Sequence, residues 1–498
     1  MNSSFCKART LSVAALALLL SACSVTPPAE PELPFSLPDH FNAAPASAYA
    51  PAEHWWGDFA DDELNRFVDT ALVSNPGVAQ ALARARIAEA RVRLNRADQL
   101  PMVGVGLGST RQRQNLGTIA APSAQAGGDM YIISNNHNAA LDVSWELDLW
   151  GRLSALTAAA RADYLASAEQ LRGLRQSVAA QVVQLYFDNV HARAQVELSE
   201  RTVETLTEMS RQIGNRVDVG IASPADAMLS EANLGSAQAG LEQRREALER
   251  NLRQLEILLG RYPAGRLQTA DVLPGVPASP TAGIPAQLLE RRPDVRAAEL
   301  ALLGAGYQLG AAQRSFLPSL SLSGSAGYAG SQFSELFSSS NLVWSIAGQI
   351  LQPIFQGGRL VAQVDVAEGQ QSEALHAYAE TALNALSEVE SLLAVETLLQ
   401  RREQTLDASA SAAEEAVRVS YNRYQQGIDP FLNVLESQQR ALDGRSAYIT
   451  ARLARIENRI ALHLALGGGF DNQTERAEQP AEDDAANSRM TPRTTRNP

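Results

Sequence analysis

The fold is decided by residues 141–148, which read Leu-Asp-Val-Ser-Trp-Glu-Leu-Asp. Apolar and polar side chains alternate strictly here, and a period of two is the pattern of a β-strand with one apolar face. Three further stretches alternate in the same way, through Val103, Val105, Leu107, Leu320, Leu322, Leu342, Trp344 and Ile346. We therefore predict two hairpins, with strands over residues of about 102–110, 138–148, 318–327 and 341–352.

The length of these strands suits a membrane. A tilted strand crosses the hydrocarbon core in about ten residues, and aromatic side chains gather at both interfaces. The aromatic residues available for such girdles are Trp145, Trp150, Tyr328, Trp344 and Phe355. Alternation is a weak signal in any one segment, and the edge of a soluble β-sandwich is the alternative interpretation.

The chain contains a two-fold internal repeat. The positions of Pro76 and Pro293 differ by 217 (293 − 76), whereas those of Gly151 and Gly358 differ by 207 (358 − 151). The offset is 217 before the hairpin segments and 207 after them, so the hairpin segment of the first repeat is ten residues longer than that of the second (217 − 207). We predict one repeat over residues 51–260, a linker over residues 261–286 and a second repeat over residues 287–469.

Each repeat contains one very long predicted helix. Almost no Gly or Pro lies between Gly151 and Gly220, and the same holds from Gly358 to Gly427. Apolar residues follow at spacings of three and four, as in coiled coils. A helix of this length measures about 100 Å at roughly 1.5 Å per residue. Shorter helices are predicted over residues 76–101 and 220–260.

The first residues indicate export and lipidation. Residues 1–22 have a charged start followed by an apolar stretch too short to span a bilayer, the pattern of a signal peptide. The sequence Leu-Ser-Ala-Cys at residues 20–23 resembles the bacterial lipobox, so Cys23 is the predicted lipidated N-terminus, carrying N-palmitoyl and S-diacylglycerol groups. An ordinary cleavage site beside a chance cysteine is the alternative.

The two ends of the mature chain differ in composition from the rest. Residues 23–50 are rich in Pro and Ala, and residues 470–498 are polar with few aliphatic side chains. We expect both segments to be poorly ordered, because neither has enough apolar surface to bury.

Composition excludes several classes of function. The net charge of −13 argues against nucleic-acid binding, and the only lysine, Lys7, lies in the leader, which excludes a Walker-type nucleotide site. The six histidines show no paired-ligand spacing and no nucleophile elbow is present. We expect no metal, no enzyme activity and no cofactor apart from the lipid on Cys23.

A physical argument requires several copies of the chain. Open strand edges in lipid leave backbone groups unpaired, and about eight strands form the smallest membrane barrel. Four strands are too few to close one. Two copies would give a barrel filled by side chains, and three copies would give twelve strands with room inside.

The repeat, the hairpin placement and residues 427–436, Gly-Ile-Asp-Pro-Phe-Leu-Asn-Val-Leu-Glu, resemble TolC-type outer-membrane factors. Trp55-Trp56 and the run Ala-Leu-Gly-Gly-Gly at residues 465–469 add to the resemblance, and the lipobox is similar to that of the OprM/NodT-like lipoprotein branch. The resemblance implies a mainly α fold with a transmembrane β-barrel. It implies a homotrimer whose twelve-stranded barrel joins a long coiled α-helical periplasmic barrel.

The resemblance also implies a gate at the periplasmic helix turns, residues 216–230 and 423–437. Leu432 and Glu436 match the positions of an apolar and an acidic ring, although Glu436 replaces the more usual aspartate. We expect Asp429, Arg423 and Tyr424 to hold the closed state through hydrogen bonds and ion pairs between neighbouring helices. From spacing alone, Leu432 would pack in the coil and Glu436 would be a solvated flanking residue.

The predicted function is the passive outer-membrane duct of a tripartite multidrug efflux system. Its partners would be a periplasmic membrane-fusion adaptor, an inner-membrane pump of the RND type and outer-membrane lipid. Two alternatives are the duct of a type I protein secretion system and a structural periplasmic coiled-coil lipoprotein without a pore. The second alternative leaves the alternating strands unexplained.

Overall fold

The computed structural model describes residues 34–42, 54–115, 131–280 and 282–468. The chain forms two compact units. The strand unit contains the described parts of Ala83–Ala168 and Ala297–Glu380. The helical unit contains the described parts of Phe35–Leu82, Glu169–Arg296 and Thr381–Pro498.

The helices confirm the two-fold repeat. Helices of 22, 67 and 35 residues follow one another in each repeat. In the first repeat they are α3 (Pro76–Ala97), α4 (Arg152–Asp218) and α5 (Pro224–Leu258). In the second repeat they are α7 (Pro293–Arg314), α8 (Arg359–Gln425) and α9 (Phe431–Ala465). The first positions of α3 and α7 differ by 217 (293 − 76), and those of the other two pairs differ by 207 (359 − 152 and 431 − 224). The remaining short helices are η1 (Trp55–Phe59), α2 (Asp62–Ser74), α6 (Pro285–Arg291), η2 (Phe333–Glu335) and η3 (Ser339–Asn341).

Local sequence determines where the helices begin. Asp148 caps α4, because its carboxylate accepts hydrogen bonds from the backbone N–H groups of Leu153 at 3.0 Å and Ser154 at 2.7 Å. Proline is the first residue of α3, α5 and α7. A backbone N–H at this position has no partner within the helix, so its absence in proline costs no helical hydrogen bond. Among the described residues, no helix is both long and apolar enough to cross a membrane.

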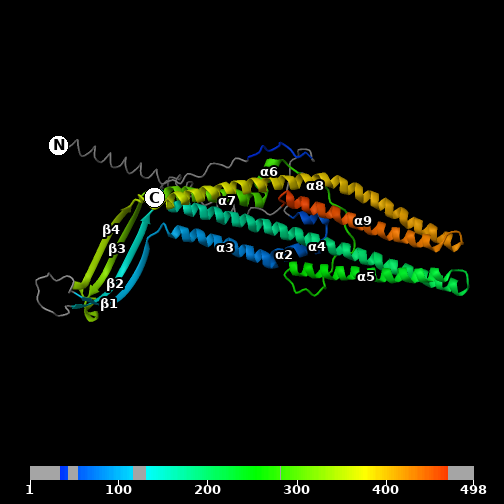
Figure 1. The fold of residues 1–498 in the computed structure, drawn as a ribbon, viewed down its shortest axis with the longest axis horizontal. Helices are drawn as coiled ribbons and strands as arrows, with labels where there is room; N and C mark the ends of the chain where they lie inside the picture. Colours follow the sequence, from blue (N-terminus) through cyan, green and yellow to red (C-terminus); the bar gives the residue numbers. More distant parts are fainter. Residues whose placement is uncertain (1–33, 43–53, 116–130, 281, 469–498) are drawn as a thin grey trace, which may run out of the picture. The chain divides into compact units, whose positions relative to one another are not determined.

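Figure 1 shows the four strands side by side in one antiparallel sheet of order β1-β2-β3-β4. They are β1 (Met102–Asn115), β2 (Tyr131–Leu147), β3 (Ser319–Gly330) and β4 (Leu342–Leu351). The first hairpin is longer than the predicted strands, which ended near residue 110 and began near residue 138. Residues 111–115 pair with residues 131–135 through the backbone, although their mostly polar side chains hide this extension from a hydrophobicity pattern.

The register gives the sheet two chemically different faces. One face is apolar and carries Val103, Val105, Leu107, Ala139, Leu141, Val143, Trp145, Leu320, Leu322, Ala326, Tyr328, Leu342, Trp344, Ile346 and Ile350. The other face is mainly small or polar, with Gly104, Gly106, Ser321, Ser323, Ser325, Asp142, Glu146 and Gln349. The apolar face is exposed, since Trp344 keeps 73% and Ile346 79% of its surface.

Two of the tryptophans predicted for a girdle bind backbone near the helix-bearing ends of the strands. The indole N–H of Trp145 donates to the carbonyl of Gln99 at 2.9 Å, and that of Trp150 donates to the carbonyl of Pro318 at 2.7 Å. These bonds fix the junction between strands and helices within the strand unit. Phe355 and Trp344 are highly exposed, as an interfacial position requires.

The main core lies in the helical unit, where η1 and α2 pack against α4 and α9. Its members include Trp55, Trp56, Phe67, Tyr186 and Phe187, all of them buried. Asp61 caps α2 and also accepts a hydrogen bond from the hydroxyl of Tyr186 at 2.5 Å. Burial raises the pKa of Tyr186, and its bond to Asp61 raises it further.

Candidate functional site

The candidate gate lies in the helical unit, where each pair of long helices ends in a tight turn. At the α8–α9 turn, Gly427 has a φ of 72°, which L side chains rarely adopt. The N–H of Ile428 returns to the carbonyl of Arg423 at 3.0 Å, and that of Gly427 returns to Tyr424 at 2.9 Å. Gly220 has the same φ at the α4–α5 turn, so both turns use one helix-ending motif.

An ion pair closes the α8–α9 turn. The Arg423 guanidinium reaches both carboxylate oxygens of Asp429, with Nε to Oδ2 at 2.6 Å and Nη2 to Oδ1 at 3.1 Å. This pairing lowers the pKa of Asp429 and raises that of Arg423. The α4–α5 turn has Ala222 at the position equivalent to Asp429, so the bridge belongs to the second repeat only.

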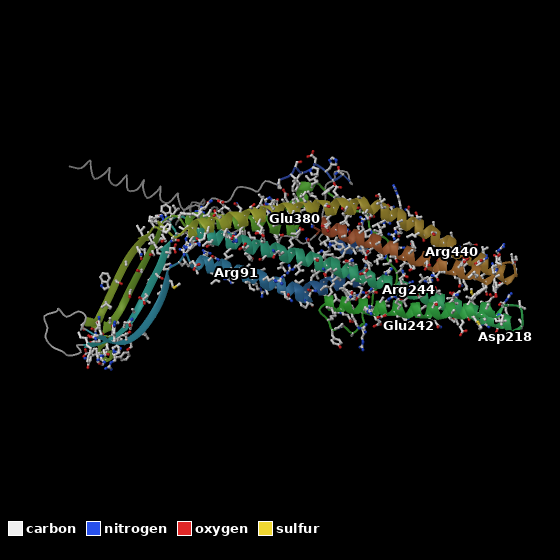
Figure 2. The ribbon with its side chains drawn as sticks, viewed as in Figure 1. Arg91, Asp218, Glu242, Arg244, Glu380 and Arg440 are labelled. Carbon is white, nitrogen blue, oxygen red and sulfur yellow. The ribbon has the colours of Figure 1, made fainter. Side chains whose placement is uncertain are left out.

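Leu432 and Glu436 lie one turn apart on the first part of α9. Leu432 is 53% exposed, and the side chain of Glu436 is exposed to the same degree. Glu436 accepts a hydrogen bond from Arg440 at 2.9 Å, one further turn along α9 (Figure 2). Leu432 therefore does not pack inside this chain's own coil.

Tyr424 differs from the expectation that it would hold the gate by hydrogen bonding. It is buried, with 8% exposure, and its ring lies 5.3 Å from that of Phe431. Within the described residues its hydroxyl has no hydrogen-bond partner. Burial raises the pKa of Tyr424, the charge of Asp226 raises it further and that of Arg216 lowers it. Tyr424 is thus part of an apolar cluster, whose members come from both hairpins.

We call this group the tip cluster. It joins the two hairpins at their ends and consists of Met209, Ile213, Tyr424, Phe431, Val434 and Leu435. The guanidinium of Arg216 on α4 stands 5.2 Å from the centre of the Tyr424 ring, and the Tyr421 hydroxyl donates to the side chain of Gln212. Sequence reasoning missed the α4 members, although Met209, Ile213 and Arg216 follow the three-and-four spacing.

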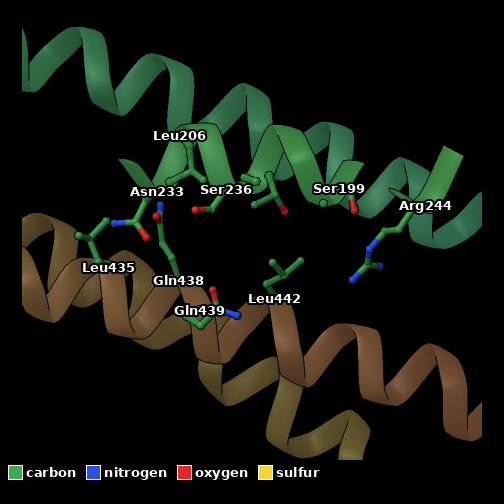
Figure 3. A pocket seen from close by; sticks show the side chains of 12 residues that line it. Ser199, Leu206, Asn233, Ser236, Arg244, Leu435, Gln438, Gln439 and Leu442 are labelled. Atoms are coloured by element: carbon green, nitrogen blue, oxygen red, sulfur yellow. The ribbon is translucent and has the colours of Figure 1, made fainter. Parts of the chain in front are cut away.

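A polar pocket of about 210 Å³ lies near the tip cluster, between α4, α5 and α9 (Figure 3). Ser199 and Leu206 line it from α4, and Asn233, Ser236 and Arg244 line it from α5. On α9 it is lined by Leu435, Gln438, Gln439 and Leu442. The described residues contain no group of three or more His, Cys, Asp or Glu that could hold a metal ion.

Comparison with known proteins gives the family. A model of the family described as outer membrane efflux protein matches residues 67–261 and 284–468. The outer membrane protein OprJ of Pseudomonas aeruginosa is 33% identical, covering 92% of this chain and 95% of OprJ. The chain belongs to the outer membrane efflux protein family.

Further relatives agree with this assignment of the efflux protein. The toluene efflux pump outer membrane protein TtgC of Pseudomonas putida is 31% identical, over 95% of this chain and 98% of TtgC. The solved structure of the outer-membrane channel OprN is 26% identical and has a TM-score of 0.81, covering 90% of this chain and 99% of OprN. The efflux protein therefore has the TolC-like channel fold and resides in the outer membrane.

The structure describes the predicted gate residues of this efflux protein but not its predicted lipidation site. Arg423, Tyr424, Asp429, Leu432 and Glu436 all lie at the α8–α9 end, within one part of the helical unit. The predicted lipidation site, Cys23, lies outside the described residues, as do the predicted signal peptide and the C-terminal segment from residue 470. The Arg423–Asp429 bridge lies within one turn of a single chain, whereas we expected contacts between neighbouring helices.

Proposed function

We propose that the efflux protein is the passive exit duct of a tripartite multidrug efflux system, built from three copies of this chain. The observation that supports this most strongly is the four-stranded sheet with one apolar and one polar face. An apolar face suits contact with lipid, and a polar face suits a water-filled interior. Such a duct supplies a path and performs no reaction of its own.

The sheet edges support the trimer. β1 pairs with β2 alone and β4 with β3 alone within the described residues, so both outer strands keep unpaired backbone groups. In hydrocarbon each such group costs several kcal/mol. Pairing β1 of one copy with β4 of the next satisfies them, and three copies form a twelve-stranded ring.

The exposed residues of α9 support a gate. In a three-fold ring, each copy would place Leu432 and Glu436 at the same level, giving an apolar ring and an acidic ring. The Arg423–Asp429 bridge would hold each turn in its closed form. Because exposed ion pairs contribute little to stability, a partner that contacts the turn has only a small energy to overcome.

We assign that role to a periplasmic membrane-fusion adaptor, working with an inner-membrane pump of the RND type. The lipid on Cys23 would add an anchor in the outer membrane. Three acyl chains, at roughly 0.8 kcal/mol per buried methylene, hold a protein on a bilayer almost irreversibly.

Single-channel conductance in planar bilayers tests the gate. We expect Glu436→Ala and Asp429→Ala to raise the conductance or the open fraction, because the first removes ring charge and the second releases the turn. The matched control is Glu242→Ala on α5, an exposed carboxylate whose removal changes the charge equally (Figure 2). Conductance equal to that of the control in both variants would show that these residues do not gate the duct.

A further inference from the structure

The apolar face of the sheet changes character beyond the row formed by Leu107, Ala139, Tyr328 and Leu342. This row lies toward the ends of the strands opposite those joined to α3, α4, α7 and α8, within the strand unit (Figure 1). Beyond it, β1 and β2 continue together without β3, through residues 110–115 paired with residues 131–136.

Two arginines lie on the apolar side of this extension. Side chains alternate along a strand, so Arg111 and Arg113 share the face of Val105 and Leu107. Both arginines are exposed. The opposite face at this level carries Thr110, Gln112 and Gln114 of β1 and their partners Asn136, Ser134 and Ile132 of β2, none of which is charged. The positive charge is therefore confined to the outward side.

One aromatic ring contacts Arg113, and others lie on the same face of the sheet. The guanidinium carbon of Arg113 stands 3.8 Å from the centre of the Tyr131 ring. Phe333 and Phe337, in the loop between β3 and β4, are 70% and 66% exposed. Their rings pack edge-on against His137 at 5.7 Å and Tyr328 at 5.5 Å, both on the same outward face.

The order of side-chain types along this face of the strands matches the boundary of a membrane. Exposed apolar side chains suit the hydrocarbon, aromatic rings gather at the level of the headgroups, and arginines beyond them reach the headgroup phosphates. Within the described residues, no ion pair is formed by Arg111 or Arg113. The other ionisable groups among the described residues of this region are His137, Glu335 and the phenols of Tyr131 and Tyr328.

We propose that Arg111 and Arg113 form a binding site for the phosphate groups of phosphorylated lipids in the outer leaflet. The planar guanidinium donates two parallel hydrogen bonds to a phosphate, and two such groups, on alternate positions of one strand, suit a ligand with more than one phosphate. The site rests on the proposed insertion of the sheet in the membrane. The ends of the strands that carry the arginines would then face the outer leaflet.

The test uses the full-length protein in maltoside micelles, titrated with fluorescent diphosphorylated lipid A. We expect Arg111→Gln/Arg113→Gln to weaken binding by about tenfold, because two charge-assisted contacts are lost. Arg111→Lys/Arg113→Lys should retain most of the binding. The matched control is Arg66→Gln/Arg250→Gln, which removes two exposed arginines of the helical unit and should bind like the wild type.

Several results would overturn the proposal. One is equal affinity of the double glutamine variant and the control. Another is competition by inorganic phosphate beyond that of sodium chloride at the same ionic strength, which would indicate a site for free anions. If the double variant does not form ion-conducting channels, the two single variants replace it, and unchanged binding in both contradicts the site. Channel conductance of each variant separates loss of lipid binding from failure of the proposed duct.

Discussion

At the scale of the residue, the most unusual side chain is His463 in the helical unit. It is 5% exposed and its ring stacks on that of Trp55, at 5.1 Å and 10° between the planes. Its Nε2 has no hydrogen-bond partner within the described residues. Burial, together with the smaller effect of the positive charge of Arg459, lowers the pKa of His463 to about 4.

This histidine predicts a pH dependence of stability. In the unfolded chain the imidazole takes up a proton near its ordinary pKa of 6.5, whereas in the folded protein it stays neutral down to about pH 4. The unfolded state binds more protons in this window, so stability falls as the pH is lowered from about 6.5 to 4, by up to about 3 kcal/mol.

Thermal unfolding of the detergent-solubilised protein measures this effect. The fall of Tm between pH 7 and 4.5 should be smaller in His463→Gln than in the wild type. His376→Gln, which changes an exposed histidine on α8, is the control and should keep the wild-type slope. Equal slopes in all three proteins would show that His463 does not titrate as described.

Tyr424 shows what the sequence predicts about a residue and what it does not. Its place beside the turn followed from Gly427, because glycine ends helices in this way. Its burial did not follow, since two of the side chains in its cluster, Met209 and Ile213, belong to the other repeat and are distant in the sequence. Spacing along one helix identifies an apolar stripe but not the helix that covers it.

At the scale of the element, proline and glycine predicted the helices well. Pro76 and Pro293 begin equivalent helices, and Gly220 and Gly427 follow equivalent helix ends. The strands were predicted less completely, because β1 and β2 continue through polar residues that only backbone pairing orders. The short helices α2 and α6 were not predicted. With seven residues, α6 is too short to show a helical period, whereas the spacing of Leu64, Phe67, Val68 and Ala71 in α2 is a signal that the sequence analysis missed.

We predict that replacing glycine by alanine has opposite effects on stability in a helix-ending turn and in the interior of a helix. Gly427→Ala should destabilise by about 1–2 kcal/mol, because its φ of 72° is strained for alanine although nothing lies within 4 Å of the added Cβ. Gly235→Ala, in the interior of α5 and equally free of neighbours, should stabilise by about 0.5–1 kcal/mol.

Shifts of Tm in the two variants measure these effects. The comparison is matched, because each variant adds one methyl group at a position with open space. A Gly427→Ala variant as stable as the wild type would mean that the α8–α9 turn adopts another conformation.

At the scale of the whole molecule, the account depends on the number of copies. The sheet leaves the edges of β1 and β4 unpaired within the described residues, and its apolar face remains exposed in a single chain. A single copy in a bilayer would leave those edge groups without partners. The sequence predicted four strands and hence several copies, while the choice of three came from the family resemblance.

Native mass spectrometry of the detergent-extracted, full-length protein tests the number of copies most directly. We predict a complex of three chains that resists detergent without heating and conducts ions when added to planar bilayers. A mass of one chain, in material that never conducts ions, would contradict the account.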